Sequence, residues 1–188
     1  MSTGKLFVIS GPSGAGKGTL VARLLKDVPN AWLSISATTR APREGETNGV
    51  EYWFMTREEF ESEIEKGMFF EWACYNGNYY GTPKRPVLAH LNDGNPAILE
   101  IEVQGAAQIK EQMPESVLIF IEPPSLEVLR ERLIKRGTES MEVIEQRIEN
   151  AKRELLCKDE YDFVLLNDDL EEASQTLIRF VMETNEDR

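Results

Sequence analysis

The chain has 188 residues, of which 41% are hydrophobic, and its formal net charge at pH 7 is -12. This length is enough to bury a hydrophobic core, and the composition excludes an intrinsically disordered chain. The excess of acidic residues argues against a nucleic-acid-binding protein, whose surface is normally basic. No apolar run approaches the roughly 20 residues that cross a bilayer, so we expect no membrane segment.

The first motif lies between two predicted elements, a buried apolar strand at 6–10 and a helix at 17–27. It reads G-x-x-x-x-G-K, in which glycines let backbone N–H groups converge on a polyphosphate and a lysine reaches the terminal phosphates. The helix start adds partial positive charge. An ordinary glycine-rich turn would not explain the lysine at this spacing. We therefore predict a nucleoside triphosphate site at Gly11, Pro12, Ser13, Gly14, Ala15, Gly16, Lys17, Gly18 and Thr19.

Gly18 departs from this motif, because a Ser or Thr hydroxyl at the same position normally contacts Mg²⁺. Thr19 follows one residue later, about 100° further around the helix, and cannot simply replace it. The sequence therefore leaves the Mg²⁺ ligands open. Phosphate oxygens, water molecules and Glu102 acting through a water are the candidates.

Residues 36–95 hold many of the aromatic side chains, with short strands expected near 50–55, 68–75 and 78–82 and a capped helix after Thr56. Arg40 and Arg43 lie beside a proline in this segment. Their guanidinium groups match phosphate oxygens, although arginines on an exposed loop can also be merely solvated. Glu71 stands between two aromatic residues, where a buried carboxylate needs a partner. The alternative for Glu71 is a strand glutamate that faces solvent.

The rest of the chain alternates between apolar strands and amphipathic helices. We expect strands at 97–101, 117–121 and 162–166. Strands separated by helices predict a parallel sheet that helices cover on both faces. Gly137 separates two charged helices, an arrangement that suits a lid closing over a ligand. The expected helices lie at 104–112, 125–136, 140–156 and 170–184.

Cys74 and Cys157 form no spaced framework, and the first strand begins within a few residues of Met1. We therefore expect a cytoplasmic protein with reduced thiols and without a signal peptide. The chain has a single histidine, His90, so we expect no zinc site. The sequence leaves the oligomeric state open, a homo-oligomer included.

Six segments together resemble the guanylate kinase family in their order and spacing, and they extend over nearly the whole chain: SGPSGAGKGT, SATTRAPREGETNGVEYWF, FFEWACYNGNYYGTP, ILEIEVQG, KRGTE and VLLNDD. The resemblance implies an α/β fold of three-layer P-loop NTPase type with a parallel sheet. Its core would comprise 1–35, 96–125 and 159–188, with an inserted mixed α/β GMP-binding lobe at 36–95 and a helical lid at 126–158. The implied enzyme is an ATP:GMP phosphotransferase of purine nucleotide metabolism and GMP recycling. It would use GMP or dGMP and ATP with Mg²⁺, and would have no nucleic-acid or membrane partner.

The same resemblance implies roles for individual side chains. Arg40, Arg43, Tyr52 and Tyr80 would hold the GMP phosphate. Guanine would be read by Ser36, Glu71 and Thr82, with Glu46 and Glu100 supporting the site. The lid arginines Arg132, Arg136 and Arg147 would reach across the ATP phosphates, and Asn167 with Asp168 would lie at the adenine end. Lys17 and these five arginines are the catalytic candidates.

Two alternatives stand beside this interpretation. One is a guanylate-kinase-like binding module of a scaffold protein, but such modules typically lack the phosphate loop that Lys17 and its glycines complete here. The other is a related small kinase with a different acceptor. Glu71 argues against it, because guanine offers an N1–H and an amine on one edge, whereas adenine would leave the carboxylate unpaired.

Overall fold

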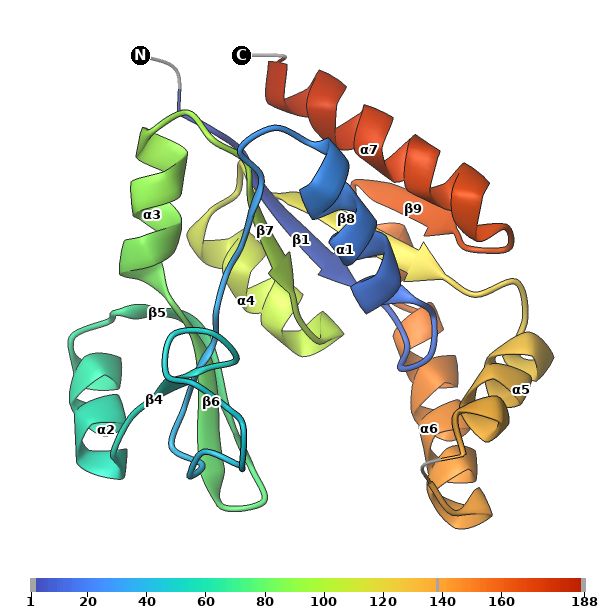
Figure 1. Ribbon diagram of the computed structural model, residues 1–188, viewed down its shortest axis with the longest axis horizontal. Coiled ribbons are helices and arrows are strands. Elements are labelled where there is room, and N and C mark those ends of the chain that lie inside the picture. Colours follow the sequence, from blue (N-terminus) through green and yellow to red (C-terminus); the bar gives the residue numbers. More distant parts are fainter. Residues whose placement is uncertain (1–2, 138, 187–188) are drawn as a thin grey trace.

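The computed structural model describes residues 3–137 and 139–186. Its centre is a parallel sheet with the strand order β2-β7-β1-β8-β9 (Figure 1). β1 is buried along its whole length, as expected of a strand that helices cover on both faces. The strands are β1 (Leu6–Ser10), β2 (Trp32–Leu33), β7 (Ala97–Glu100), β8 (Val117–Glu122) and β9 (Phe163–Leu166).

Alternate side chains of β1 enter two separate hydrophobic cores, because successive residues of a strand point to opposite faces. Phe7 and Ile9 pack with α1 (Lys17–Asp27) and α7 (Leu170–Glu186). Leu6 and Val8 pack on the other face, where the covering helices are α3 (Lys84–Asn92) and α4 (Val103–Gln112). The predicted three-layer α/β architecture is therefore confirmed.

A smaller sheet, in the order β4-β3-β6-β5, is inserted between β2 and β7. Its tight turn at Asn76 and Gly77 has positive φ values of 49° and 78°, the conformation of a two-residue hairpin turn. Phe60 of α2 (Arg57–Glu65) stacks on Phe69 and Tyr79 at centroid distances of 4.3 and 5.3 Å. The strands are β3 (Ala37–Thr38), β4 (Trp53–Phe54), β5 (Phe69–Tyr75) and β6 (Asn78–Pro83).

Helices α5 (Leu126–Arg136) and α6 (Met141–Leu155) form a pair that stands opposite the small sheet (Figure 1). They share a core of their own. The Ser125 hydroxyl caps α5 by accepting a bond from Val128 N at 3.1 Å. Gly137 ends α5 with φ 66°, and a short 3-10 helix, η1 (Lys158–Glu160), leads into β9.

Two expectations about the local structure are wrong in detail. The strand expected near 50–55 shortens to Trp53–Phe54, because the residues before it form a turn in which Gly49 N donates to the Tyr52 carbonyl at 2.8 Å and side chains add further bonds. Asn48 Oδ1 accepts a bond from Phe54 N at 2.8 Å, and Glu51 accepts one from Thr47 N at 2.7 Å. The prediction also gave no bounds for α3 and no strand at β2 or β3. Within the described ranges, no helix is both long enough and apolar enough to cross a membrane.

Removing the N-terminal cap of α2 should weaken the fold measurably. The Thr56 hydroxyl accepts a bond from Glu59 N, and the Glu59 carboxylate accepts one from Thr56 N at 2.8 Å. We expect Thr56→Ala to lower the free energy of unfolding by about 1 kcal/mol in urea denaturation. Thr47→Ala, an exposed threonine of the neighbouring loop, is the control and should change it by less than about 0.5 kcal/mol. Equal values for the two variants would contradict the capping role.

Candidate active site

The loop from Gly11 to Gly16 joins β1 to α1 and is shaped by glycines at its crossing points. Gly11 has a φ of 143°, and a Cβ there would collide with the carbonyl oxygen of Ile121. Only glycine lets the loop pass so close to the end of β8. α1 begins at Lys17, so its unpaired N-terminal N–H groups open onto the loop.

Lys17 is folded over this loop. Its ammonium group donates to the carbonyl oxygens of Gly11 and Pro12, the second at 3.2 Å. Burial lowers the pKa of Lys17, while the nearby carboxylates of Glu102 and Glu100 act in the opposite direction. The site therefore holds a partly desolvated cation at the helix start, where a phosphate group can replace the two carbonyls.

A cavity of about 360 Å³ lies on one side of the loop. Many of the residues expected to bind ATP line its wall. The helix pair contributes Arg132 and Arg136 to its wall, and Lys135 lies beside them. The expected residues that line it from the core are Gly14, Gly16, Thr19, Asn167 and Asp168.

Two of the three arginines expected in the lid contact the core. Arg132 donates to the carbonyl oxygen of Asn167 at 2.9 Å. Arg147 donates to the Ser13 hydroxyl at 2.7 Å and forms an ion pair with Glu139. Both guanidinium groups are thus held at the edge of the loop by neutral or acidic groups that an incoming phosphate can displace.

A second cavity, of about 650 Å³, lies between the small sheet, α4 and α6. Five of the residues expected for GMP line it, and Ser13 and Arg147 join them from the loop and the helix pair. Thr82 does not line it. Its side chain is buried, and its hydroxyl donates to Glu71 Oε1 at 2.6 Å from the neighbouring strand. The five expected residues are Ser36, Tyr52, Glu71, Tyr80 and Glu100.

The carboxylate of Glu71 is the most constrained group of this cavity. Burial raises the pKa of Glu71, and the hydroxyl of Thr82 partly offsets that rise. A Cβ on Gly105 of α4 would lie 3.3 Å from Glu71 Oε2, so the helix backbone packs directly against the carboxylate. The sequence analysis did not single out Gly105. Glu71 is therefore fixed in place and suited to accept hydrogen bonds from a ligand in the cavity.

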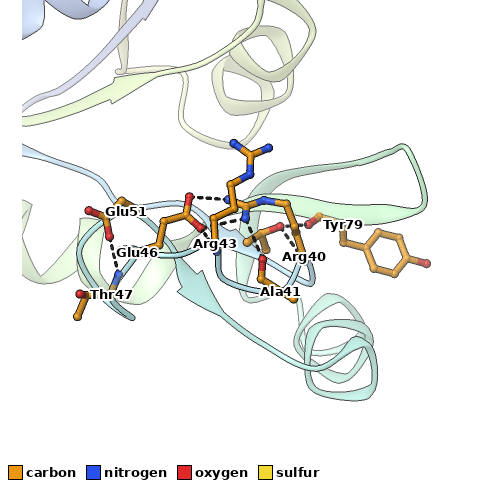
Figure 2. A network of polar contacts seen from close by, with 8 residues as sticks. Arg40, Ala41, Arg43, Glu46, Thr47, Glu51 and Tyr79 are labelled. Atoms are coloured by element: carbon orange, nitrogen blue, oxygen red, sulfur yellow. Dashed lines mark hydrogen bonds and ion pairs between the residues drawn. The ribbon is translucent and has the colours of Figure 1, made fainter.

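Arg40 lies beside the aromatic wall of the same cavity. Its two terminal nitrogens donate to the two Glu46 oxygens, each at 2.9 Å (Figure 2). Its Cζ lies 5.3 Å from the centroid of the Tyr52 ring, and Tyr52 packs against Tyr80 at 6.0 Å. The structure thus brings together three of the four residues expected around the GMP phosphate.

Arg43 is tied to this group through its backbone. Its N–H donates to Glu46 at 2.7 Å, whereas its guanidinium group extends away from the hydrogen-bonded network in Figure 2. Glu46 therefore holds the Arg40 side chain and the Arg43 backbone at once. Its position explains why both arginines stand on one rigid loop.

Sequence reasoning missed two polar side chains on α6, Asn150 and Glu154. Asn150 and Glu154 line the second cavity together with Arg147. One Glu154 oxygen is buried without a hydrogen-bond partner among the described residues. Burial and the charge of Glu102 raise the pKa of Glu154, and the charge of Lys17 opposes them. The three residues share one helix face at spacings of three and seven, and that periodicity is the signal that could have found them.

The side chains around Gly18 are the candidates for contacting Mg²⁺. Within residues 3–137 and 139–186, no group of three or more His, Cys, Asp or Glu side chains is arranged to hold a metal ion. A Cβ on Gly18 would lie 3.8 and 3.9 Å from the two oxygens of Glu100. The carboxylate of Glu100 therefore faces the place where the motif normally has a hydroxyl, beside Lys17.

Comparisons with known proteins agree with this arrangement. A family model described as guanylate kinase matches residues 3–184. The chain belongs to the guanylate kinase family. The resemblance drawn from its sequence motifs is thereby confirmed.

Curated guanylate kinases are similar over most of their length. The enzyme of Desulfitobacterium hafniense is 53% identical over 167 residues, which cover 89% of this chain and 84% of that one. The enzyme of Synechocystis sp. is 50% identical over 180 residues, 96% of this chain and 94% of its own. The crystal structure of guanylate kinase from Anaplasma phagocytophilum superposes with a TM-score of 0.76 at 34% identity, covering 98% of this chain and 87% of that one.

The pairing of Glu46 with Arg40 should make the stability of the fold depend on pH. Hydrogen bonds from Arg40 and from the Arg43 backbone lower the pKa of Glu46 from 4.5 to about 2. A group whose pKa is lower in the folded state stabilises fully above its unfolded pKa, and this contribution is lost as the pH falls through the folded pKa. The melting temperatures of wild type and Glu46→Gln should therefore differ most above pH 4.5 and converge toward pH 2.

Thermal unfolding followed by circular dichroism from pH 6 to pH 2 measures this difference. Glu44→Gln, an exposed carboxylate of the same loop, is the matched control and should run parallel to the wild type at every pH. A gap between wild type and Glu46→Gln that stays constant down to pH 2 would show that the ion pair does not cause it.

Proposed function

We propose that the chain transfers the γ-phosphoryl group of ATP to GMP or dGMP and releases ADP and GDP. One observation carries the proposal: the phosphate loop separates the two cavities. Gly14 and Gly16 line the first cavity, and Ser13 lines the second. Two nucleotides in these cavities would bring their phosphate ends together at the loop, as the transfer requires.

The cavity of about 360 Å³ is the proposed ATP site. The loop N–H groups and Lys17 would cradle the phosphates, which the positive end of α1 also favours. Arg132, Arg136 and Arg147 of the helix pair would reach the same phosphates. Asn167 and Asp168 line the same cavity, and the adenosine part would lie beside them.

The cavity of about 650 Å³ is the proposed GMP site. Glu71 would accept hydrogen bonds from N1–H and the N2 amine of guanine, with Ser36 nearby, while Thr82 holds Glu71 from behind. Arg40, Arg43, Tyr52 and Tyr80 would hold the phosphate, and Glu46 orients the arginines. Glu100 completes the site at the end of β7.

The reaction asks for little covalent chemistry from the protein. The acceptor phosphate is already an anionic nucleophile, so positioning and charge neutralisation account for most of the catalysis. Lys17 and the five arginines supply positive charge around both phosphate groups. Closure of the helix pair would exclude water, which otherwise competes for the γ-phosphoryl group.

The residues present fit Mg²⁺ as the partner of ATP. This ion binds through one or two carboxylates together with substrate phosphates and water, and does not need a closed cage of protein ligands. We propose Glu100, which faces Gly18, and Glu102, acting through water, as the carboxylates nearest the ion. The ion would neutralise phosphate charge during transfer.

We also propose the wider setting of the enzyme. Residues 36–95 serve as the GMP-binding lobe, 126–158 as the lid, and 1–35, 96–125 and 159–188 as the core. The enzyme works in the cytoplasm on small-molecule nucleotides, in purine nucleotide metabolism and GMP recycling. Chromatography with light scattering would decide between a monomer and a homo-oligomer.

A coupled assay of ADP formation with ATP and Mg²⁺ tests the function. GMP and dGMP should be phosphorylated, and AMP, UMP and dTMP should not. Lys17→Ala should lower kcat by at least about 100-fold, because it removes charge that acts on the transferred group. The circular dichroism spectrum of this variant should match the wild type. Binding of GMP without turnover in the wild type would instead indicate a binding module, and equal use of AMP would indicate another kinase.

Glu71→Gln should separate guanine recognition from phosphate chemistry. The amide replaces one acceptor with a donor that faces the donors of guanine, so kcat/KM for GMP should fall by roughly 100-fold or more. The affinity for ATP, measured by calorimetry, should remain within about twofold. Glu65→Gln, an exposed carboxylate on α2, is the control and should keep wild-type kinetics. If Glu71→Gln keeps the wild-type preference for GMP, Glu71 does not recognise guanine.

A further inference from the structure

Asn167 forms hydrogen bonds to three separate parts of the molecule. It follows β9 and is only 4% exposed. Its Nδ2 donates to the carbonyl oxygen of Ala15 at 2.7 Å, and its backbone N–H donates to Glu122 at 2.8 Å. Its own carbonyl accepts the bond from Arg132. Asn167 thus joins the phosphate loop, the strand β8 and the lid helix α5 at one point.

The bond to Ala15 determines the direction of the next N–H group. In a planar trans peptide the C=O and the N–H point in opposite directions. Because Asn167 holds the carbonyl of Ala15, the N–H of Gly16 is directed away from Asn167. Gly16 is the N-cap of α1, so this N–H belongs to the donors at the helix start that have no carbonyl partner one turn earlier.

Gly16 and Asn167 are matched in shape. Gly16 has a φ of 96°, which side chains rarely adopt, and a Cβ there would collide with Asn167 Nδ2. The glycine of the motif therefore admits the side chain of Asn167 into contact with the loop backbone. This contact also fixes the orientation of the Asn167 amide, because the carbonyl of Ala15 can only accept and must therefore face the NH₂ group.

We propose that Asn167 is a positioning residue, which holds the Ala15–Gly16 peptide so that the loop N–H groups face the polyphosphate. Through its carbonyl it also links the loop to the lid arginine Arg132. The inference rests on the proposed function, since it takes the loop to bind the phosphates of ATP. It differs from reading adenine, which would engage the side chain with the base and leave the loop unaffected.

A ligand without a base separates the two roles. Asn167→Leu has a side chain of similar size without a donor. We expect it to weaken the binding of ATP and of inorganic tripolyphosphate by the same factor, on the order of tenfold, in calorimetry. Asp168→Ala should weaken the binding of ATP and leave the binding of tripolyphosphate unchanged. GMP binding in the second cavity is the internal reference and should stay within twofold. Asn92→Leu, an exposed asparagine on α3, is the matched control for the substitution itself.

Each result decides for or against the proposal. Loss of ATP affinity with normal tripolyphosphate affinity would make Asn167 a reader of the base, and loss of neither would leave it without a role at the site. If Asn167→Leu does not fold, the wild type supplies the test by NMR. The ¹⁵N–¹H signal of Gly16 should then be among those that shift most on addition of tripolyphosphate, and an unmoved signal would overturn the proposal. A wild type that binds tripolyphosphate as expected but does not phosphorylate GMP would refute the function alone.

Discussion

Repulsion between two sets of phosphates is the constraint on which the structure depends. The chain itself carries a net charge of -12, so the positive charge that such ligands need must be concentrated. The structure gathers it around one loop. There three cations contact neutral oxygen atoms that phosphate can displace: loop carbonyls for Lys17, the Ser13 hydroxyl for Arg147 and the Asn167 carbonyl for Arg132. Arg40 differs from these, because both of its terminal nitrogens donate to Glu46, whereas Arg147 pairs with Glu139 through one nitrogen.

The difference between these cations matches two kinds of task. A side chain that must select and orient an acceptor benefits from being fixed before the ligand arrives, since less entropy is then lost on binding. Arg40 and Glu71 are held in this way, by Glu46 and Thr82 respectively. Side chains that must follow the transferring group benefit from weaker partners. Lys17 and Arg132 have these, since their partners are carbonyl oxygens.

The sequence predicted what is encoded at short range and missed what depends on strand register or tertiary approach. The phosphate loop is a continuous segment between a strand and a helix, so its glycines and Lys17 could be identified directly. Thr82 was expected to read the base, but only the register of β5 against β6 reveals that its hydroxyl faces Glu71. Gly105 and Glu154 approach the site from helices distant in sequence. The strands β2 and β3 have two residues each, too few for any period to show.

The helix pair α5 and α6 has a hydrophobic cluster of its own, made by Leu129, Leu133, Ile144, Ile148 and Ala151. A unit that buries its own apolar side chains keeps its internal order wherever it swings. If this pair acts as the proposed lid, each catalytic cycle would need only a change in its orientation, without folding and unfolding of helices. Binding energy from the nucleotides would then align charges instead of ordering the chain, and the proposed lid would reopen for product release with the relative positions of its arginines unchanged.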